Sequence, residues 1–481
     1  MTDTVMMDAT ALGAAIRARR VSCVEVMQAY LDHIARLNPA VNAIISLRNS
    51  DELMAEARER DAEIANGRLR GALHGVPQAI KDLEFVRGIP TTMGSPLLRN
   101  FVSPTDSIMV ERMRNAGAII IGRTNTPEFG LGSHTFNPVH GATRNAYDQS
   151  RSAGGSSGGA AVALALRMLP VADGGDFGGS LRNPAGWNNV FSVRPSIGRI
   201  PSNARDLWLP SMSVLGPMAR TVPDLALLLG VQAGDDARAP MSLDGKLDLS
   251  PAALERDMKG KRIAWLGDFA GYLPFEPGVL ELCREALKTF ESLGCIVEEA
   301  MPEYPIDSVW RSFLTLRAWM AGTPLLDLYK DPKRREFLKA EAIFEIESGA
   351  KLSAYDISAA STVRSNWYAA VRRFFESYDY FILPTAQLFP FDVSIDWPKE
   401  IAGHRMETYH EWMKVVIPVT MSGCPVITVP AGFSSQGLPM GLQVVAPSHG
   451  ELACLQIGLA YDRATNWVTK RPPSLLSGAS R

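Results

Sequence analysis

Two glycine-rich segments hold the residues of this sequence that are best suited to nucleophilic chemistry. Residues 154–159 have the sequence Gly-Gly-Ser-Ser-Gly-Gly, and residues 174–180 have the sequence Gly-Gly-Asp-Phe-Gly-Gly-Ser. Backbone N–H groups gathered around one serine hydroxyl are the way in which an oxyanion hole is built. The chain between Ser156 and Ser180 is long enough for a buried helix and a return segment, so the two serines can face each other.

The first segment admits three other interpretations. Ser156 matches the Gly-x-Ser-x-Gly nucleophile elbow, but the polar residues 147–153 before it show no strand pattern, and the downstream His404, His410 and His449 lie in no recognisable motif. A flexible loop is the second alternative, although a loop that leads straight into an apolar helix favours a turn of defined geometry. A helix N-terminus also attracts anions, but the missing Gly-Lys-Ser/Thr ending excludes a P-loop.

A serine nucleophile needs a base, and Lys81 is the candidate. No histidine is close to the glycine-rich segments in the sequence, whereas Lys81 ends the apolar run 75–80 as a strand-end lysine would. Desolvation can lower the pKa of a lysine towards neutrality, which turns it into a base. The alternative is that Lys81 is an ordinary solvated charge, and this residue taken alone favours that alternative.

With these motifs in place, the sequence resembles the amidase signature enzymes. The resemblance rests on an ordered series of motifs between about residues 10 and 460, and it is weakest from about 235 to 380. The matching segments are 75–82 (Gly-Val-Pro-Gln-Ala-Ile-Lys-Asp), 122–130 (Gly-Arg-Thr-Asn-Thr-Pro-Glu-Phe-Gly), 154–159, 176–184, 216–222, 383–385 and 437–443 (Gly-Leu-Pro-Met-Gly-Leu-Gln).

The resemblance implies the fold. It predicts one large α/β domain over residues 1–481, with a mixed central β-sheet covered by helices on both faces. The core would comprise roughly residues 65–235 and 380–465. The variable segment 236–379 would be mostly helical and lie on the substrate side.

The resemblance also implies a Ser–cisSer–Lys triad. Ser180 would be the nucleophile, Ser156 the bridging serine after a cis peptide bond, and Lys81 the base. The other implied roles are an oxyanion hole from the backbone N–H groups of Phe177, Gly178, Gly179 and Ser180, and positions near the pocket for Thr124 and Gly130. The residues beside the triad suggest supporting roles: Ser157 would hydrogen-bond near it, and Asp82 would position Lys81. Asp176 and Arg182 have opposite charges and could pair to fix the nucleophile loop, although an exposed pair would contribute little. No metal and no organic cofactor are implied.

The amino-acid composition of the chain limits the kinds of partner that it can bind. Lys plus Arg number 49 and Asp plus Glu 51, so the chain has no basic excess with which to bind nucleic acid. Five scattered cysteines without a Cys-x-x-Cys pair argue against a disulfide framework and are typical of a reducing compartment. We find neither a secretory signal nor a span of apolar residues long enough for a bilayer, so we expect a cytoplasmic protein without membrane contact.

Hydrophobic periodicity indicates alternating strands and helices. Ser22 has a capping-box pattern that predicts a helix ending at Asn38–Pro39. Residues 160–169 are apolar on nearly every face, which predicts a buried helix. Residues from about 235 to 404 look like helical filling, and buried strands are expected at 75–80, 118–121, 423–430 and 441–446.

The variable segment 236–379 indicates the polarity of the substrate. It carries large apolar side chains with few Arg or Lys nearby, namely Trp310, Phe313, Leu314, Leu316, Trp319 and Met320. We therefore expect a neutral, largely apolar small molecule, either an aryl amide, a carbamate or a cyclic amide, because an anion would need a charged partner such as Arg. Trp187, Asn188, Asn189 and Phe191 depart from the run seen in tRNA-amidotransferase members. Residues 180–199 resemble instead the branch of the family that holds aryl acylamidases, carbamate-cleaving enzymes and cyclic nylon-oligomer hydrolases.

Two alternatives stay open at this point. The first is a glutamine amidotransferase subunit that delivers ammonia to a partner, and the second is a non-catalytic relative that only binds a ligand. The sequence leaves the oligomeric state open, a homo-oligomer included.

Overall fold

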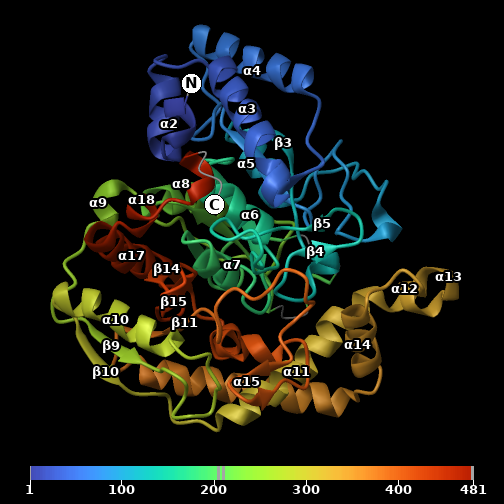
Figure 1. Cartoon of the computed structure of the whole chain (residues 1–481), viewed down its shortest axis with the longest axis vertical. Helices are drawn as coiled ribbons and strands as arrows, with labels where there is room; N and C mark the ends of the chain where they lie inside the picture. The colour runs from blue at the N-terminus through green and yellow to red at the C-terminus, as the bar shows by residue number, and fades with distance from the viewer. Residues whose placement is uncertain (1, 203–205, 209–211, 478–481) are drawn as a thin grey trace.

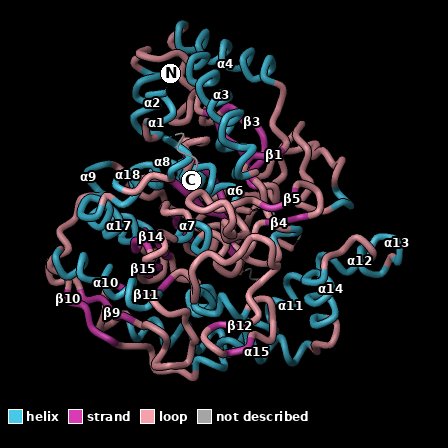
Figure 2. The backbone as a smooth tube through the Cα atoms, viewed as in Figure 1, coloured by secondary structure: helices cyan, strands magenta, loops and turns pink. Residues whose placement is uncertain are grey.

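An eight-stranded mixed sheet runs through the middle of the molecule and is enclosed by helices (Figure 2). The computed structural model describes residues 2–202, 206–208 and 212–477. In spatial order the strands are β10 (Ile296–Glu299), β9 (Arg262–Trp265), β11 (Tyr380–Pro384), β15 (Pro439–Val445), β14 (Val426–Phe433), β7 (Phe191–Arg194), β8 (Val214–Ala219) and β6 (Val171–Asp176). The pairs β10–β9 and β9–β11 are parallel, and the remaining neighbours are antiparallel.

A smaller sheet lies beside the β6 edge. It consists of β1 (Ile44–Ile45), β3 (Ile119–Thr124) and β2 (Pro77–Lys81), with β2 and β3 parallel. Side chains rather than a backbone ladder join β2 to β6: Gln78 Nε2 donates to the Val171 carbonyl at 2.9 Å, and the Lys81 N–H meets the Asp173 carboxylate at 3.2 and 3.3 Å. We call this contact between β2 and β6 the seam. It places Lys81 beside the strand that leads to Ser180.

Helices cover both faces of the large sheet (Figure 1). On one face lie α6 (Gly158–Ala165) and α7 (Arg182–Trp187), and on the other lie α8 (Val222–Gln232), α10 (Val279–Ser292) and α17 (Glu451–Thr465). Gly186 of α7 packs against Gly441 of β15, whereas Gly458 of α17 packs against Ile427 of β14. Ile427 pairs with Val444, an odd number of residues from Gly441, so the two helices face opposite sides. The expected α/β architecture is confirmed.

The N-terminal helices form a layer of their own at the top of Figure 1. They are α1 (Thr2–Met6), α2 (Ala9–Arg17), α3 (Cys23–Val41) and α4 (Ser50–Ala65), with α5 (Ile108–Asn115) beside them. The capping box at Ser22 is present, but the predicted end at Asn38–Pro39 is wrong. Proline in the last turn removes only one backbone bond. The helix therefore continues to Val41, and the left-handed Asn42 ends it by donating to the Asn38 carbonyl at 2.7 Å.

The segment expected to be helical filling also contains strands β9, β10 and β11, which form one side of the large sheet. The remaining helices are α9 (Pro251–Leu254), α11 (Ile306–Gly322), α12 (Leu326–Lys330), α13 (Pro332–Arg335), α14 (Ala340–Gly349), α15 (Ala354–Phe374), α16 (Ile417–Ser422) and α18 (Trp467–Lys470). Two short pairs, β4–β5 (Phe136–Asn137, Gly141–Ala142) and β12–β13 (Glu400–Ile401, His404–Arg405), lie in loops. Figure 1 shows α12 and α13 projecting from the body. No described helix has the length and apolarity to cross a membrane.

The buried helix α6 explains the small residues after Ser157. Every residue of α6 is buried, and a side chain at Gly159 would come within 2.4 Å of the Asn125 nitrogen and 2.6 Å of the Ala43 carbonyl oxygen. These contacts are backbone atoms, which cannot turn aside as a flexible side chain can. Only glycine lets α6 approach the small sheet this closely.

We predict that Gly159→Ala lowers the free energy of unfolding by about 1–3 kcal/mol or more, because the added methyl group overpacks a rigid contact. The matched control is Gly230→Ala in α8, whose added methyl would meet only Leu249 at 3.7 Å. That change should raise stability by up to about 1 kcal/mol through helix propensity. Urea unfolding of both variants measures the difference, and similar values would contradict this account of α6.

Candidate active site

A cavity of about 790 Å³ opens beside the seam and contains all three residues of the expected triad. Lys81 and Ser156 are 2% exposed and Ser180 is 8% exposed, so the reactive atoms are almost closed off from water. Most of the wall is apolar. The lining residues are Lys81, Leu83, Glu84, Met93, Phe129, Gly130, Leu131, Ser156, Gly174, Gly175, Phe177, Ser180, Asp206, Ser213, Leu215, Arg317, Trp319, Met320, Ala321, Thr323, Pro324, Leu325, Leu326 and Asp327.

Three polar atoms surround the Lys81 amine. Nζ lies 2.7 Å from Ser156 Oγ, 2.8 Å from Ser157 Oγ and 3.2 Å from the Gly175 carbonyl oxygen. The carbonyl can only accept, so one N–H points at Gly175. A neutral amine has a second N–H, which Ser157 Oγ can accept, and one lone pair. The lone pair is then left for the hydroxyl proton of Ser156.

Burial lowers the pKa of Lys81 to about 7, because desolvation outweighs the attraction of Asp173, Asp176 and Glu84 for the protonated form. No carboxylate forms an ion pair with Nζ among the described residues. Asp173 lies under the Lys81 backbone, fully buried, and burial raises the pKa of its carboxyl to about 7 as well. A substantial neutral fraction of the amine is therefore present near neutral pH.

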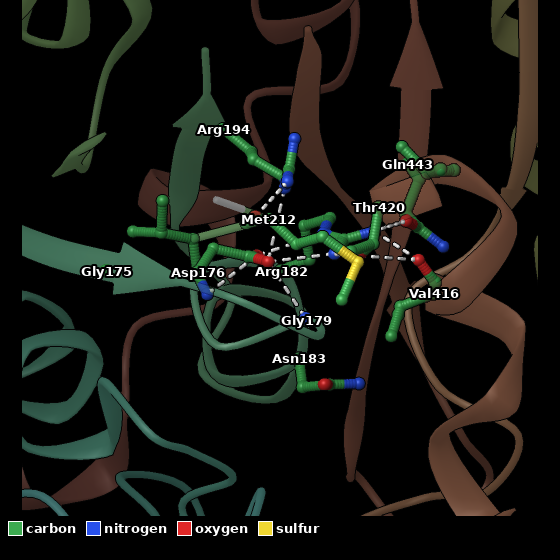
Figure 3. Close-up of polar contacts among 12 residues, drawn as sticks. Gly175, Asp176, Gly179, Arg182, Asn183, Arg194, Met212, Val416, Thr420 and Gln443 are labelled. Carbon is green, nitrogen blue, oxygen red and sulfur yellow. Dashed lines mark hydrogen bonds and ion pairs between the residues drawn. The ribbon is translucent and has the colours of Figure 1, made fainter. Parts of the chain in front are cut away.

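The loop that carries Ser180 is held by a buried acid. Asp176 is the last residue of β6, and its carboxylate accepts the N–H group of Gly179 at 2.9 Å (Figure 3). The same carboxylate accepts the N–H group of Leu181 at 3.0 Å. The Ser180 carbonyl in turn accepts the Ser157 N–H at 3.1 Å. These bonds fix the loop at both ends of the serine and tie it to the segment of Ser156.

Arg182, the first residue of α7, balances the charge of Asp176. Its Nε and Nη2 bind the two carboxylate oxygens at 3.0 and 2.8 Å (Figure 3). The remaining donors reach the Val416 carbonyl, Gln443 Oε1 and Thr420 Oγ1, each at 2.7 Å, so all five guanidinium N–H groups are used.

A second arginine acts on the same carboxylate, since Arg194 Nε approaches Asp176 Oδ1 at 3.3 Å. Burial alone would favour the protonated acid, but Arg182 and Arg194 hold the pKa of Asp176 well below its usual range. The sequence suggests that Asp176 and Arg182 could pair. The structure shows that this pair is fully buried, not an exposed pair of little worth.

The oxyanion hole differs in one residue from what the resemblance implies. The Gly179 N–H is bonded to Asp176, so this group does not face the cavity as a donor. None of the described backbone or side-chain groups accepts the N–H groups of Phe177, Gly178 and Ser180. These three remain as the candidate donors. Gly179 instead supplies a left-handed φ of 99° that turns the loop.

The bridging segment has the geometry that the resemblance implies, since the Gly155–Ser156 peptide bond is cis. The elbow alternative finds no support, because no histidine lines the described cavity. His404 and His449 are exposed, and His410 is buried against Glu345.

Asp82 and Thr124 do not lie where the sequence analysis places them, whereas Gly130 does. Asp82 does not position the Lys81 amine; it pairs with Arg123 at 3.3 Å and accepts two bonds from Thr92. Thr124 is fully buried in β3 next to Lys81 in register and is not part of the cavity wall. Gly130 does line the cavity, and a Cβ there would lie 3.7 Å from Ser156 Oγ.

Arg317 is a cavity residue that sequence reasoning missed. The aromatic run of α11 is poor in charge, yet Arg317 lines the cavity from that run, together with Trp319 and Met320. Trp310 and Phe313 are core residues, as aromatics at helical spacing usually are. The partner of Arg317 is Glu345 on α14, so no local pattern in α11 points to the pair.

Comparison with known proteins decides the family. The sequence profile described as Amidase matches residues 25–455. The chain belongs to the amidase family. An acylamidase of Rhodococcus erythropolis is 32% identical over 473 residues, covering 98% of each protein. A glutamyl-tRNA(Gln) amidotransferase subunit of Acidothermus cellulolyticus is 34% identical over 498 residues, covering 98% of this chain and 97% of that protein.

Solved structures agree with the sequence comparison. A bacterial aryl acylamidase of the amidase signature family has a TM-score of 0.91 at 29% identity, covering 99% of each chain. A 6-aminohexanoate cyclic dimer hydrolase complexed with substrate has a TM-score of 0.85 at 25% identity, covering 98% of this chain and 99% of the other. The resemblance to amidase signature enzymes is confirmed, and this amidase is an enzyme that hydrolyses carbon–nitrogen bonds.

We predict that Arg182→Gln lowers the free energy of unfolding by about 3–5 kcal/mol, because it leaves the Asp176 charge buried without its main partner. The matched control is Arg372→Gln, which breaks an exposed pair with Glu376 and should cost no more than about 0.5 kcal/mol. Chemical denaturation measures both values. An Arg182→Gln protein as stable as the control would contradict the role assigned to this pair.

Proposed function

We propose that this amidase hydrolyses a neutral, largely apolar amide through an acyl-enzyme on Ser180. The observation that carries the proposal is the Lys81 amine: it is buried, has a pKa near neutrality, and lies 2.7 Å from Ser156 Oγ in the cavity that contains Ser180. A buried amine of this kind is a base and not a structural charge.

The proton moves from Ser180 to Ser156 while the proton of Ser156 moves to Lys81 Nζ. No described hydrogen bond joins the two serine hydroxyls, so this link forms in the substrate complex, where catalytic bonds tighten. Ser180 Oγ bonds to the carbonyl carbon, and the N–H groups of Phe177, Gly178 and Ser180 hold the resulting oxyanion.

The second half of the reaction reverses the relay. The proton on Lys81 returns through Ser156 to the amine nitrogen, and the carbon–nitrogen bond breaks with the electron pair on nitrogen. Water then gives a proton to the same relay and attacks the acyl carbon. The carboxylic acid leaves, and the hydroxyl of Ser180 and the neutral amine of Lys81 are restored.

We predict that kcat/KM rises with pH and levels off above about pH 7, because the amine of Lys81, with a pKa of about 7, must lose its proton to act as a base. Asp173 attracts the protonated form, so Asp173→Asn should move the rise to lower pH. The measurement is a pH–rate profile of both proteins with one substrate. A maximum in acid, or a rise that Asp173→Asn moves upwards, contradicts the assignment of Lys81.

The cavity wall supports an apolar substrate. Met93, Phe129, Leu131, Leu215 and Trp319 offer apolar surface, and burying a ring of the ligand against it contributes roughly 1.5–3 kcal/mol. The names of the solved relatives agree with this substrate class, since one is an aryl acylamidase and one a cyclic dimer hydrolase.

The second candidate is a glutamine amidotransferase subunit, which the similarity to the glutamyl-tRNA(Gln) amidotransferase proteins favours. Such a subunit would hydrolyse glutamine and pass ammonia to a partner protein. Most of the wall is apolar, and the guanidinium of Arg317 already pairs with Glu345, so we rank this function second. Binding without catalysis is ranked below both, because Lys81, Ser156 and Ser180 all line one cavity.

We predict that kcat/KM for a neutral acetanilide exceeds that for glutamine by about tenfold or more, as expected from the burial of one aromatic ring. Steady-state kinetics with the purified chain provide the comparison. Ser180→Ala is the control, and it should remove nearly all turnover with either substrate. Equal values, or preference for glutamine, would place the amidotransferase function first.

A further inference from the structure

Arg317 brings a charged group into the largely apolar wall of the cavity that contains Ser156 and Ser180. Its side chain is only 5% exposed. Nε donates to Glu345 Oε1 at 2.7 Å, and Nη2 donates to the Tyr409 hydroxyl at 3.0 Å. The guanidinium also lies over the ring of Phe177, 4.9 Å from its centroid. A residue held from three sides has a fixed orientation in the cavity.

One guanidinium nitrogen of Arg317 makes none of these contacts. Nη1 has no hydrogen-bond partner among the described contacts. It is also not one of the fully buried polar atoms that lack a partner, so it keeps some surface exposed. Because the side chain is nearly buried and lines the cavity, the surface that Nη1 retains faces the cavity. A guanidinium donor without a partner in such a place gains from any acceptor that the substrate brings.

The charge of Arg317 is already balanced. Glu345 Oε1 accepts Arg317, the Tyr409 hydroxyl and His410 Nε2 together. Although burial favours the protonated acid, Arg317 and the two hydrogen bonds lower the pKa of Glu345 to about 2, and burial lowers the pKa of His410. The pair of Arg317 and Glu345 is thus neutral as a whole. A substrate carboxylate would have to share one guanidinium with Glu345, whereas a neutral oxygen would not.

We propose that Nη1 of Arg317 binds a second, neutral acceptor oxygen of the substrate, apart from the carbonyl that is cleaved. This inference rests on the proposed function and makes its substrate more specific. The substrate is then an apolar amide that carries a further carbonyl-type oxygen. Arg317 is a substrate-binding residue in this account, and the variable segment contributes it through α11.

The test uses two sets of three substrates that differ at one group. On the acyl side they are the hexanoyl, 5-oxohexanoyl and glutaryl 4-nitroanilides, and on the amine side 4-ethylacetanilide, 4-acetylacetanilide and 4-acetamidobenzoate. Each set compares an alkyl group, a ketone and a carboxylate of similar size. Steady-state kinetics are measured for the unaltered protein and for Arg317→Lys, which keeps the charge beside Glu345 but lacks Nη1.

We expect the ketone to exceed the alkyl substrate in kcat/KM by about tenfold or more in one of the two sets, as one hydrogen bond to a charged donor allows. Arg317→Lys should abolish this preference by raising KM for the ketone with little change in kcat. The matched control is Arg311→Lys, a change at an exposed arginine of the same helix that pairs with Asp307, and it should leave the preference intact.

Other results overturn the inference. An equal fall in kcat for all six substrates in Arg317→Lys would show that Arg317 acts only through Phe177. A carboxylate preferred over the ketone would show an anion site, and no preference in the unaltered protein would show no site. If the unaltered protein hydrolyses none of the six substrates, the proposed function itself fails. The Ser180→Ala protein then shows the same background rate as the unaltered protein.

Discussion

The buried pair of Asp176 and Arg182 is the interaction on which the site depends. Asp176 ends the strand that approaches the cavity, and Arg182 begins the helix that leaves it, so the pair closes the loop that carries Ser180. The same arginine reaches α16, β15 and the residue before α16 through Thr420, Gln443 and Val416. A charge that is costly to bury is thereby used to fix one loop against two distant parts of the chain.

The residues of the proposed triad could be named from the sequence because each lies in a segment that carries the family resemblance. Ser156, Ser180 and Lys81 each stand in a motif whose glycines or strand-end position have a direct structural reason. Strand β6 was not expected, because Gly174, Gly175 and Asp173 do not have the hydrophobic alternation of a strand, although the ladder with β8 includes all three. Its glycines instead allow the Ser157 and Leu181 side chains to approach.

Features that depend on distant partners could not be predicted in this way. The Gly179 N–H looks like an oxyanion donor until Asp176 is found to accept it. Arg317 looks like one polar residue in an aromatic helix until Glu345 and Tyr409, 28 and 92 residues further along, are placed around it. The substrate side of the cavity is assembled from such pairings, whereas the reaction side is assembled from motifs. Reaction class is therefore easier to predict from this sequence than substrate.

The seam between β2 and β6 has a consequence for how activity responds to heat. Lys81, the proposed base, stands on one sheet, and Ser180, the proposed nucleophile, follows a strand of another. The described polar contacts between the two strands come from side chains, not from a backbone ladder. Their separation is thus set by packing, which loosens in small steps, while each sheet is held by cooperative hydrogen bonding. Warming should uncouple the base from the nucleophile before either sheet melts, so that loss of turnover precedes loss of secondary structure.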